Sequence, residues 1–347
     1  MLVVDDSSLA RKMISRELSK DPSIEVIETA PDAYVARDLI VEKEPDVITL
    51  DIEMPKMDGL TFLKKIMNHN PLPVVVVSSL SQDGSDAAME AVNSGAVDVV
   101  GKPGNEFGKE MKDLSVDLRE KVKLAARVDI TRYQRIFKQN EESANGSAVE
   151  STLSEVQTTE KMVAIGSSTG GVQALKQVIP RLPASSPGVM IAQHMPSGFT
   201  SSFASSLDDA SNMQVKEAED KDRLRPGQVL VAPGDYHMVL ESRGSQKRAR
   251  IKSGPRVNNQ RPSCDVLFKS VAKEAGVNAV GVIMTGMGSD GVKGLRTMKE
   301  AGAHTIGQDE ETSTVYGMPK EAYESGAVEQ QVSLGGIPSA IMRKLKG

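Results

Sequence analysis

A chain of 347 residues, 39% of them apolar, is long enough to form two domains of ordinary size. Its formal net charge of -5 argues against a nucleic-acid-binding surface and against a polybasic membrane anchor. The sequence shows no signal-peptide pattern, no apolar run near the roughly 20 residues of a membrane helix, and a single cysteine. We therefore expect a cytoplasmic protein that is not inserted in a membrane.

Residues 1–125 alternate five times between short apolar runs and segments with apolar residues at helical spacing. The apolar runs are LVVDD, IEVIETA, DVITLD, PVVVVSS and AVDVVGKP. Continuous apolar strands of this length, separated by helices, indicate a parallel sheet with both faces covered. The pattern therefore predicts a flavodoxin-like (βα)5 α/β domain over residues 1–125.

Residues 126–159 are polar and rich in Ser and Glu, which predicts a flexible linker whose beginning is a candidate extension of the preceding helix. Residues 160–347 again alternate between strands and helices, which predicts a second, doubly wound and mostly parallel α/β domain. Within it, the runs QVLVAPG and MVLES are separated by a short turn. We expect these two runs to pair as a β-hairpin.

Five polar residues of the first domain lie at or directly after strand ends, namely Asp5, Asp6, Asp51, Ser78 and Lys102. In a doubly wound sheet such strand ends open at one edge. Three clustered carboxylates repel one another unless a cation joins them, and Mg²⁺ prefers oxygen ligands. With a hydroxyl and an ammonium beside it, Asp51 is a candidate to become an aspartyl phosphate. Acidic helix N-caps are the alternative interpretation of Asp5 or Asp6 taken alone.

The segment GSSTG, residues 166–170, joins an apolar strand to a helix and matches the pattern Gly-x-Ser-x-Gly of a nucleophile turn. It lacks the Lys of a Walker phosphate loop and the Gly-x-Gly-x-x-Gly spacing of a dinucleotide loop. Ser168 is therefore the candidate nucleophile, and Ser167, one position off the pattern, competes with it. Taken alone, the match also fits an ordinary glycine-rich turn.

A serine nucleophile needs a base, and the base needs an acid that orients it. His194 follows the run GVMIAQ and Asp290 lies just beyond AVGVIM, so both can meet Ser168 at one edge of one sheet. His237 and Asp235 are rivals for these two roles. They fall in the presumed hairpin turn, where Asp usually serves the turn itself.

Two further residues are expected to be structural. His304 begins an apolar stretch, which predicts a partly buried histidine without a catalytic role. Cys264, in RPSCDVLF, has no neighbour in the sequence that marks it as activated, so we expect a buried packing residue.

The motifs VVDDS, LDIEMPKMDGL, VVVVSSL and VVGKP resemble those of response-regulator receiver domains over residues 1–125. This resemblance implies that Asp5, Asp6 and Asp51 hold Mg²⁺ and that Asp51 accepts the phosphoryl group. It further implies that Lys102 is the phosphate partner and Ser78 the switch hydroxyl. Receiver domains usually have several residues before the first motif, so a short first strand is expected here.

The motifs AIGSSTGG, QHMPSGFTSSFA, VAPGDYHM, RPSCDVLF and VIMTGMGSDG resemble the catalytic domain of CheB, the family of chemotaxis protein-glutamate methylesterases, over residues 160–345. This resemblance implies that Ser168 is the nucleophile, His194 the general base and Asp290 its orienting acid. It also assigns the backbone N–H of Met287 to the oxyanion site. No cofactor is implied for the ester hydrolysis.

Together the two resemblances imply a phosphorylation-activated hydrolase of chemotaxis adaptation within a two-component system. Its expected substrates are glutamate methyl esters on chemoreceptors, hydrolysed with release of methanol, and specific receptor glutamines, which it would deamidate. A cognate histidine kinase is the expected phosphodonor.

The residues alone indicate only acyl transfer. The alternative is a response regulator whose second domain merely binds a partner; a DNA-binding output is disfavoured because no basic helix pair is present.

Overall fold

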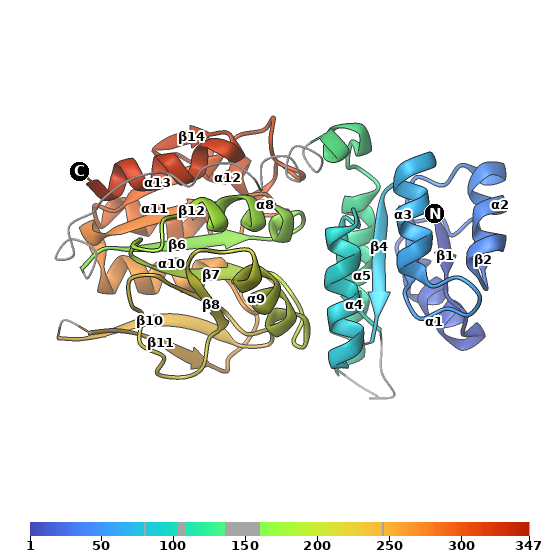
Figure 1. Cartoon of the computed structure of the whole chain (residues 1–347), viewed down its shortest axis with the longest axis horizontal. Helices are drawn as coiled ribbons and strands as arrows, with labels where there is room; N and C mark the ends of the chain where they lie inside the picture. Colours follow the sequence, from blue (N-terminus) through green and yellow to red (C-terminus); the bar gives the residue numbers. More distant parts are fainter. Residues whose placement is uncertain (80, 103–108, 136–159, 245, 347) are drawn as a thin grey trace. The chain divides into compact units, whose positions relative to one another are not determined.

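The computed structural model describes residues 1–79, 81–102, 109–135, 160–244 and 246–346. The chain divides into two compact units, Met1–Phe137 and Lys138–Gly347. In Figure 1 the first unit runs from blue to green-blue and the second from green to red.

The first unit is built on a five-stranded parallel sheet with the strand order β2-β1-β3-β4-β5. Every residue of β1, β3 and β4 is buried, as expected for short aliphatic strands with both faces covered. The predicted doubly wound fold of this unit is confirmed. Its elements in chain order are β1 (Leu2–Val4), α1 (Ser8–Leu18), β2 (Glu28–Ala30), α2 (Ala33–Lys43), β3 (Ile48–Asp51), α3 (Gly59–His69), β4 (Val74–Ser78), α4 (Gln82–Asn93), β5 (Asp98–Gly101) and α5 (Lys109–Ala125).

The chain beyond α5 stays packed on the first unit for a further stretch. Residues 130–135 are helical, and the buried Tyr133 donates its hydroxyl proton to the carbonyl of Ala96 at 2.9 Å. The beginning of the predicted linker 126–159 is therefore part of the folded unit, because an aromatic side chain there finds both burial and a polar partner. The rest of that linker, residues 136–159, lies outside the described residues.

The second unit contains a seven-stranded sheet with the order β14-β13-β12-β6-β7-β9-β8, all of whose neighbouring strands run parallel. The predicted mostly parallel α/β fold is confirmed. Its elements are β6 (Met162–Ser167), α8 (Gly171–Val178), η1 (Ile179–Arg181), β7 (Gly188–Gln193), α9 (Phe199–Asp209), β8 (Gln214–Glu217), β9 (Gln228–Val231), β10 (His237–Arg243), β11 (Gln246–Lys252), α10 (Cys264–Glu274), η2 (Gly276–Asn278), β12 (Ala279–Ile283), α11 (Val292–Glu300), β13 (His304–Gln308), α12 (Met318–Glu324), β14 (Gln330–Val332), η3 (Leu334–Gly336) and α13 (Ile337–Lys346).

The β-hairpin of this unit is formed by β10 and β11, which pair antiparallel from His237–Lys252 to Arg243–Gln246. The predicted pairing of residues 228–231 with the MVLES run is wrong, because β9 lies inside the parallel sheet between β7 and β8. The true partner, QKRARIK, escaped sequence analysis because basic residues occupy most of its positions. Only Ala249 of that strand is fully buried.

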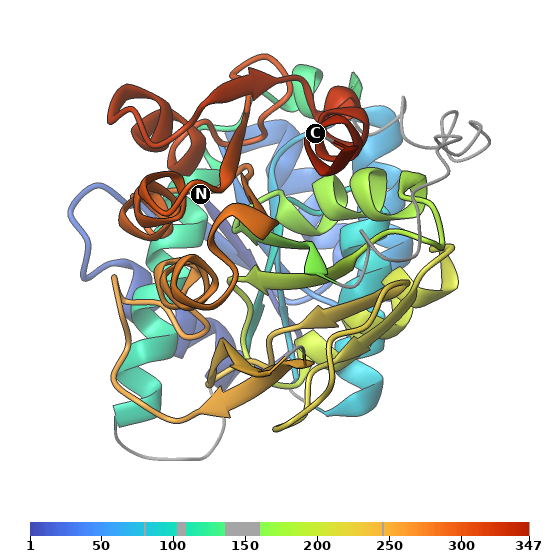
Figure 2. The same ribbon diagram turned by 90° about the vertical axis from the view of Figure 1, so that its left-hand side faces the viewer.

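Layers of side chains on both faces of the large sheet form the core of the second unit. Helices α8 and α13 lie on one side of the sheet and the hairpin on the other (Figures 1 and 2). On the hairpin side, Met162 and Met190 of the sheet pack in one hydrophobic cluster with Phe268 and Val271 of α10. Methionine and aliphatic side chains thus fill a core that has few aromatics. Within the described ranges no helix is long and apolar enough to cross a membrane.

Candidate catalytic and phosphoryl-accepting sites

The carboxyl ends of β6 and β7 lie side by side. Ser167 and Gln193, the last residues of these parallel strands, are register partners, so Ser168 and His194 each follow directly. The backbone N–H of His194 donates to the carbonyl of Ser167 at 3.0 Å, which continues the pairing beyond the strands. On the other side of β6 lies β12, and Asp290 is in the loop after it. The three predicted triad residues therefore come from adjacent strand ends at one edge of the sheet.

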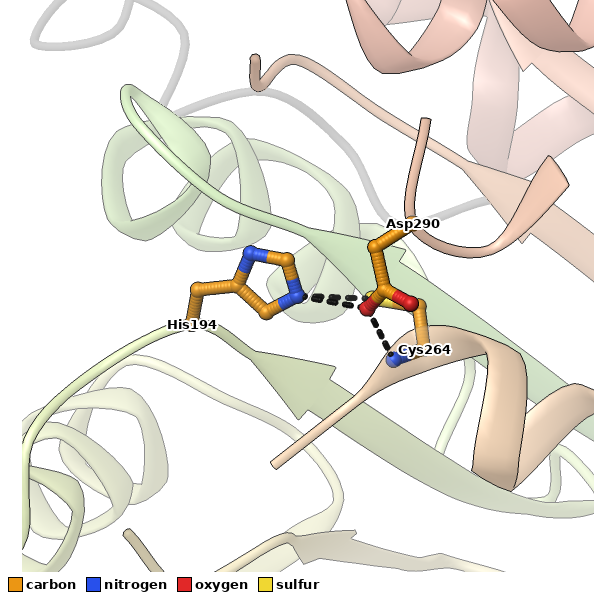
Figure 3. Close-up of side chains that lie close together, drawn as sticks. All are labelled: His194, Cys264 and Asp290. Carbon is orange, nitrogen blue, oxygen red and sulfur yellow. Dashed lines mark hydrogen bonds and ion pairs between the residues drawn. The ribbon is translucent and has the colours of Figure 1, made fainter. Parts of the chain in front are cut away.

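His194 and Asp290 form a buried pair. Nε2 of the imidazole lies 2.8 Å from Oδ2 of the carboxylate, and Cys264 lies beside both (Figure 3). Oδ2 also accepts a hydrogen bond from the backbone N–H of Cys264 at 2.7 Å. The other oxygen, Oδ1, accepts from Asn258 Nδ2 and from the hydroxyl of Ser263, both at 2.8 Å. Donors surround the carboxylate on both oxygens, which fixes its orientation.

These donors also keep Asp290 ionised. Burial alone would raise its pKa, but hydrogen bonds from His194, Asn258 and Ser263 outweigh burial and lower the pKa to about 2. An ionised carboxylate can only accept, so Nε2 of the neutral imidazole must carry the proton. Nδ1 is then the nitrogen with a free lone pair. It points away from Asp290 in Figure 3, and no described residue hydrogen bonds to it.

Ser168 lies in the turn between β6 and α8 and is half-buried. Its backbone N–H donates to Thr285 at 2.9 Å, and its carbonyl accepts from the N–H of Gly171 at 2.7 Å. The turn is thereby fixed against the end of β12 as well as the start of α8. The Ser168 hydroxyl does not hydrogen bond to Nδ1 of His194 in this structure. Such bonds often tighten only when substrate is bound.

The loop after β12 approaches the same turn closely. A Cβ at Gly286 would lie 2.5 Å from the Cβ of Ser168, and the φ of Gly286 is +155°. Only glycine avoids this clash and adopts this φ without strain. The loop therefore brings the next residue, Met287, which is 39% exposed, beside the serine turn.

The rival residues have other partners. The hydroxyl of buried Ser167 donates to Gln193 Oε1 at 2.6 Å. His237 is buried in β10 with Nε2 at 2.9 Å from the carbonyl of Pro255. Asp235 accepts from the hydroxyl of Ser197. His304, expected to be structural and partly buried, is half-buried and pairs with Glu329 at 3.0 Å. These contacts favour Ser168 and His194 as nucleophile and base.

Cys264 is fully buried, as expected for a packing residue. Its sulfur donates weakly to the carbonyl of Ala192 at 3.4 Å and lies 3.6 Å from Nε2 of His194. Burial, together with the charges of Asp290 and Asp265, raises the pKa of the thiol well above its usual value. Sequence analysis missed how close this residue lies to the candidate triad. It also missed Asn258 and Ser263; Ser263 had a signal as the N-cap before CDVLF, and Asn258 had none.

The acidic residues of the first unit converge at the carboxyl edge of its sheet. Asp5, Asp6 and Asp51 offer carboxylate oxygens that all lie within 4.8 Å of one another. Nζ of Lys102 lies 2.6 Å from Oδ2 of Asp51 and 3.1 Å from Oδ2 of Asp5. Asp5 and Asp51 are buried, whereas Asp6 is exposed.

The charges in this pocket are not balanced. Burial raises the pKa of Asp51, and Asp5 adds to the rise while Lys102 opposes it. Burial would lower the pKa of Lys102, but its pKa is raised because Asp51 and Asp5 outweigh burial. One ammonium can neutralise only one of the two buried carboxylates. Three oxygen donors with excess negative charge fit a hard divalent cation.

Ser78, the last residue of β4, faces α4. Its buried hydroxyl donates to the carbonyl of Gly84 at 3.0 Å, and its own carbonyl accepts from the N–H of Lys102. The backbone of Ser78 therefore borders the acidic pocket, while its hydroxyl is engaged by the neighbouring helix. A role as phosphate partner would require this side chain to rotate.

A (βα)5 unit with an acidic pocket, followed by an α/β unit with a serine turn, a histidine and an aspartate at one sheet edge, defines a response regulator with a hydrolase-type output domain. Two family models match the chain accordingly. The response regulator receiver domain matches residues 1–108, and CheB methylesterase matches residues 163–341. The chain belongs to the CheB methylesterase family.

Relatives resemble the chain over nearly its whole length. Protein-glutamate methylesterase/protein-glutamine glutaminase 2 of Syntrophus aciditrophicus is 51% identical over 343 residues, covering 99% of this chain and 98% of that protein. The protein of the same name from Pseudomonas aeruginosa is 45% identical over 344 residues, covering 99% and 96%. The crystal structure of the Thermotoga maritima CheB methylesterase catalytic domain covers 53% of this chain and 97% of its own, with 39% identity and a TM-score of 0.52.

Proposed function

We propose that this chain is a protein-glutamate methylesterase that hydrolyses glutamate methyl esters on chemoreceptors and releases methanol. By the same acyl chemistry it deamidates specific receptor glutamines. The names of its relatives, protein-glutamate methylesterase/protein-glutamine glutaminase, support glutamate esters and glutamine amides of proteins as the groups acted on. The observation that carries the chemistry is the buried pair of His194 and ionised Asp290 beside the turn that bears Ser168.

In the proposed mechanism Asp290 keeps the proton on Nε2 of His194, so that Nδ1 is the base. Nδ1 takes the hydroxyl proton of Ser168 while Oγ attacks the ester carbonyl. The imidazolium then gives this proton to the departing methoxide, and a glutamyl ester remains on Ser168. Water, deprotonated by Nδ1, then attacks that ester, and the imidazolium gives the proton to Oγ of Ser168 as the glutamate carboxyl group leaves. The backbone N–H of Met287 is proposed to donate to the carbonyl oxygen as it becomes negative.

The test is methanol release from membranes that carry methylated chemoreceptors. Wild-type protein should release methanol, and Ser168→Ala should lower the rate by several orders of magnitude while keeping the fold. Turnover of a small activated ester should fall in parallel. If wild-type protein releases no methanol but still binds the receptors, the second unit is a binding module and the proposed activity is wrong.

We further propose that phosphorylation of Asp51 activates this reaction, with a histidine kinase as the cellular phosphodonor. In this proposal Asp5, Asp6 and Asp51 would hold Mg²⁺, which would neutralise charge on the phosphoryl group. Lys102 would bind the phosphoryl oxygens, and Ser78 would serve as the switch hydroxyl. These partners and the single cysteine are consistent with a cytoplasmic setting.

Activation is tested with a small phosphodonor and Mg²⁺. Both together should raise methanol release by roughly 5- to 150-fold, the range of a typical coupling free energy between two sites. Asp51→Asn should keep the basal rate and lose the response. An equal response in Asp51→Asn would place the phosphoryl acceptor elsewhere.

A further inference from the structure

The side chain of Gln193 contacts both halves of the candidate catalytic pair. Its Nε2 donates to the carbonyl of Ser168 at 2.9 Å and to the carbonyl of His194 at 3.1 Å. One amide group therefore joins the backbone that carries the nucleophile to the backbone that carries the base. Gln193 is buried, so water does not compete for these bonds.

Ser167 fixes which way this amide faces. Its hydroxyl donates to Oε1 of Gln193 at 2.6 Å, and both side chains are buried. In the reverse orientation the amide oxygen would face two carbonyl oxygens and the amide nitrogen would face the hydroxyl. Two close acceptor pairs would result, so only the observed orientation is favourable. The adjacent serines of the turn thus have different tasks, because Ser167 holds Gln193 while Ser168 is left for chemistry.

The fold is shaped to admit this amide. A Cβ at Gly171 would lie 2.1 Å from Oε1 of Gln193 and 2.8 Å from the Cβ of Ser167. Any other residue at the start of α8 would push the amide out of place. Gly171 also donates its N–H to the carbonyl of Ser168, so that carbonyl receives two hydrogen bonds.

We infer that Gln193 is a positioning residue that, oriented by Ser167, sets the spacing between Ser168 Oγ and Nδ1 of His194. Its side chain holds the backbones of Ser168 and His194 and takes no part in the reaction itself. Acyl transfer depends steeply on such spacing, since a misplacement of about 1 Å can cost roughly 100-fold in rate. The inference rests on the proposed function.

Three variants test it by steady-state kinetics on a small activated ester. Gln193→Met keeps the length of the side chain and removes its polar atoms, so kcat should fall 10- to 100-fold, with KM changed less than about 3-fold. Ser167→Ala leaves the amide without its orienting donor and should give a smaller loss of kcat. Gln214→Met, an exposed change in the same sheet, is the matched control and should stay within about 2-fold of wild type.

Gln193→Glu supplies a signature that a packing role would not produce. An ionised carboxylate only accepts, and it would face two carbonyl oxygens; a protonated carboxyl can donate to one of them. The rate of this variant relative to wild type at the same pH should therefore rise as the pH is lowered. A ratio that is constant with pH would overturn the inference, even if Gln193→Met fails to fold.

The outcomes separate the inference from the proposed function. If wild-type protein turns over ester and Ser168→Ala does not, while a folded Gln193→Met retains the wild-type kcat, the positioning role is wrong and the esterase function stands. If wild-type protein shows no turnover of small ester or of methylated receptor, the proposed function fails and the positioning role fails with it.

Discussion

The sulfur of Cys264 lies 3.6 Å from Nε2 of His194, on the side of the ring away from the free Nδ1. The chain has no other thiol, and this one is fully buried with a raised pKa. Cys264 orients Asp290 through its backbone N–H and not through its side chain. The proximity of sulfur to imidazole is therefore a packing contact and does not create a second nucleophile.

Cys264→Ala should accordingly keep esterase activity within several-fold of wild type. The variant keeps the backbone N–H of residue 264, which donates to Asp290. Stability should fall by about 1–2 kcal/mol from loss of a small buried side chain. In native protein the thiol should react with iodoacetamide far more slowly than in urea-unfolded protein. Equal labelling rates in the two states would show that this thiol is accessible and activated.

The tautomer of His194 is a direct prediction of its environment. Because Asp290 is ionised and accepts from Nε2, the neutral ring should carry its proton on Nε2 and leave Nδ1 bare. Nitrogen-15 NMR at pH 8 should show a pyrrole-type Nε2 and a pyridine-type Nδ1. A proton found on Nδ1 would reverse the proposed direction of proton transfer.

Removing the orienting acid should be far more costly for catalysis than for folding. Asp290→Asn places an amide where His194 needs an acceptor for its N–H, so kcat on ester should fall by about 10⁴-fold, as in other triads. Asn258→Ala removes one donor to Asp290 and should cause a smaller loss. Asn259→Ala is its control, because Asn259 shares the left-handed backbone (φ 63°) but is not among the donors to Asp290.

The lowered pKa of Asp290 also predicts how stability depends on pH. A carboxyl whose pKa is lower in the folded state stabilises the fold above its unfolded pKa of about 3.9 and loses that contribution as the pH falls toward its folded pKa. Between pH 5 and pH 3 wild-type protein should therefore lose about 1 kcal/mol more than Asp290→Asn. Exposure of the single thiol in urea, followed with a dithiodipyridine reagent that reacts in acid, reports unfolding of the second unit. Equal losses in both proteins would contradict the lowered pKa.

The acidic pocket predicts separate roles for metal and lysine. Chelation of Mg²⁺ should abolish labelling of the chain by a small phosphodonor, and Asp51→Asn should abolish it even with Mg²⁺ present. Lys102→Ala should bind Mg²⁺ at least as tightly as wild type by calorimetry, because a competing positive charge is gone, yet respond weakly to phosphodonor. Lys64→Ala, in an exposed pair with Glu90, is the matched control. Loss of Mg²⁺ binding in Lys102→Ala would contradict this division of roles.

Sequence analysis predicted the two parallel sheets and the edges at which the candidate residues meet. That success has a local cause: aliphatic runs mark the strands, and the residue after each run lies at the carboxyl edge. The pattern failed where apolar residues do not dominate the local sequence. The basic strand β11 and the packing of Tyr133 on Ala96 are examples, because neither hydropathy nor propensity marks them.

The residues that position the candidate triad could not be predicted from the sequence for another reason. Asn258 meets Asp290 from 32 positions away, and Gln193 meets Ser167 from 26 positions away. Such contacts depend on how strands align and how loops return, and a single sequence does not encode them in any local pattern. His194 and Asp290 could be proposed because their chemistry is distinctive, whereas an amide or a hydroxyl carries no comparable mark.

The alignment of Ser167 with Gln193 limits how strand lengths can change in this fold. Successive side chains of a strand point to opposite faces of the sheet. One residue inserted into β6 would therefore place the side chain of Ser167 on the face opposite to that of Gln193. Two inserted residues would return the Ser167 side chain to the original face of the sheet but would move the end of β6 forward by about 7 Å. Insertions within β6 or β7 should therefore be excluded from chains that keep this chemistry. Changes of length should instead be tolerated in loops away from these two strand ends.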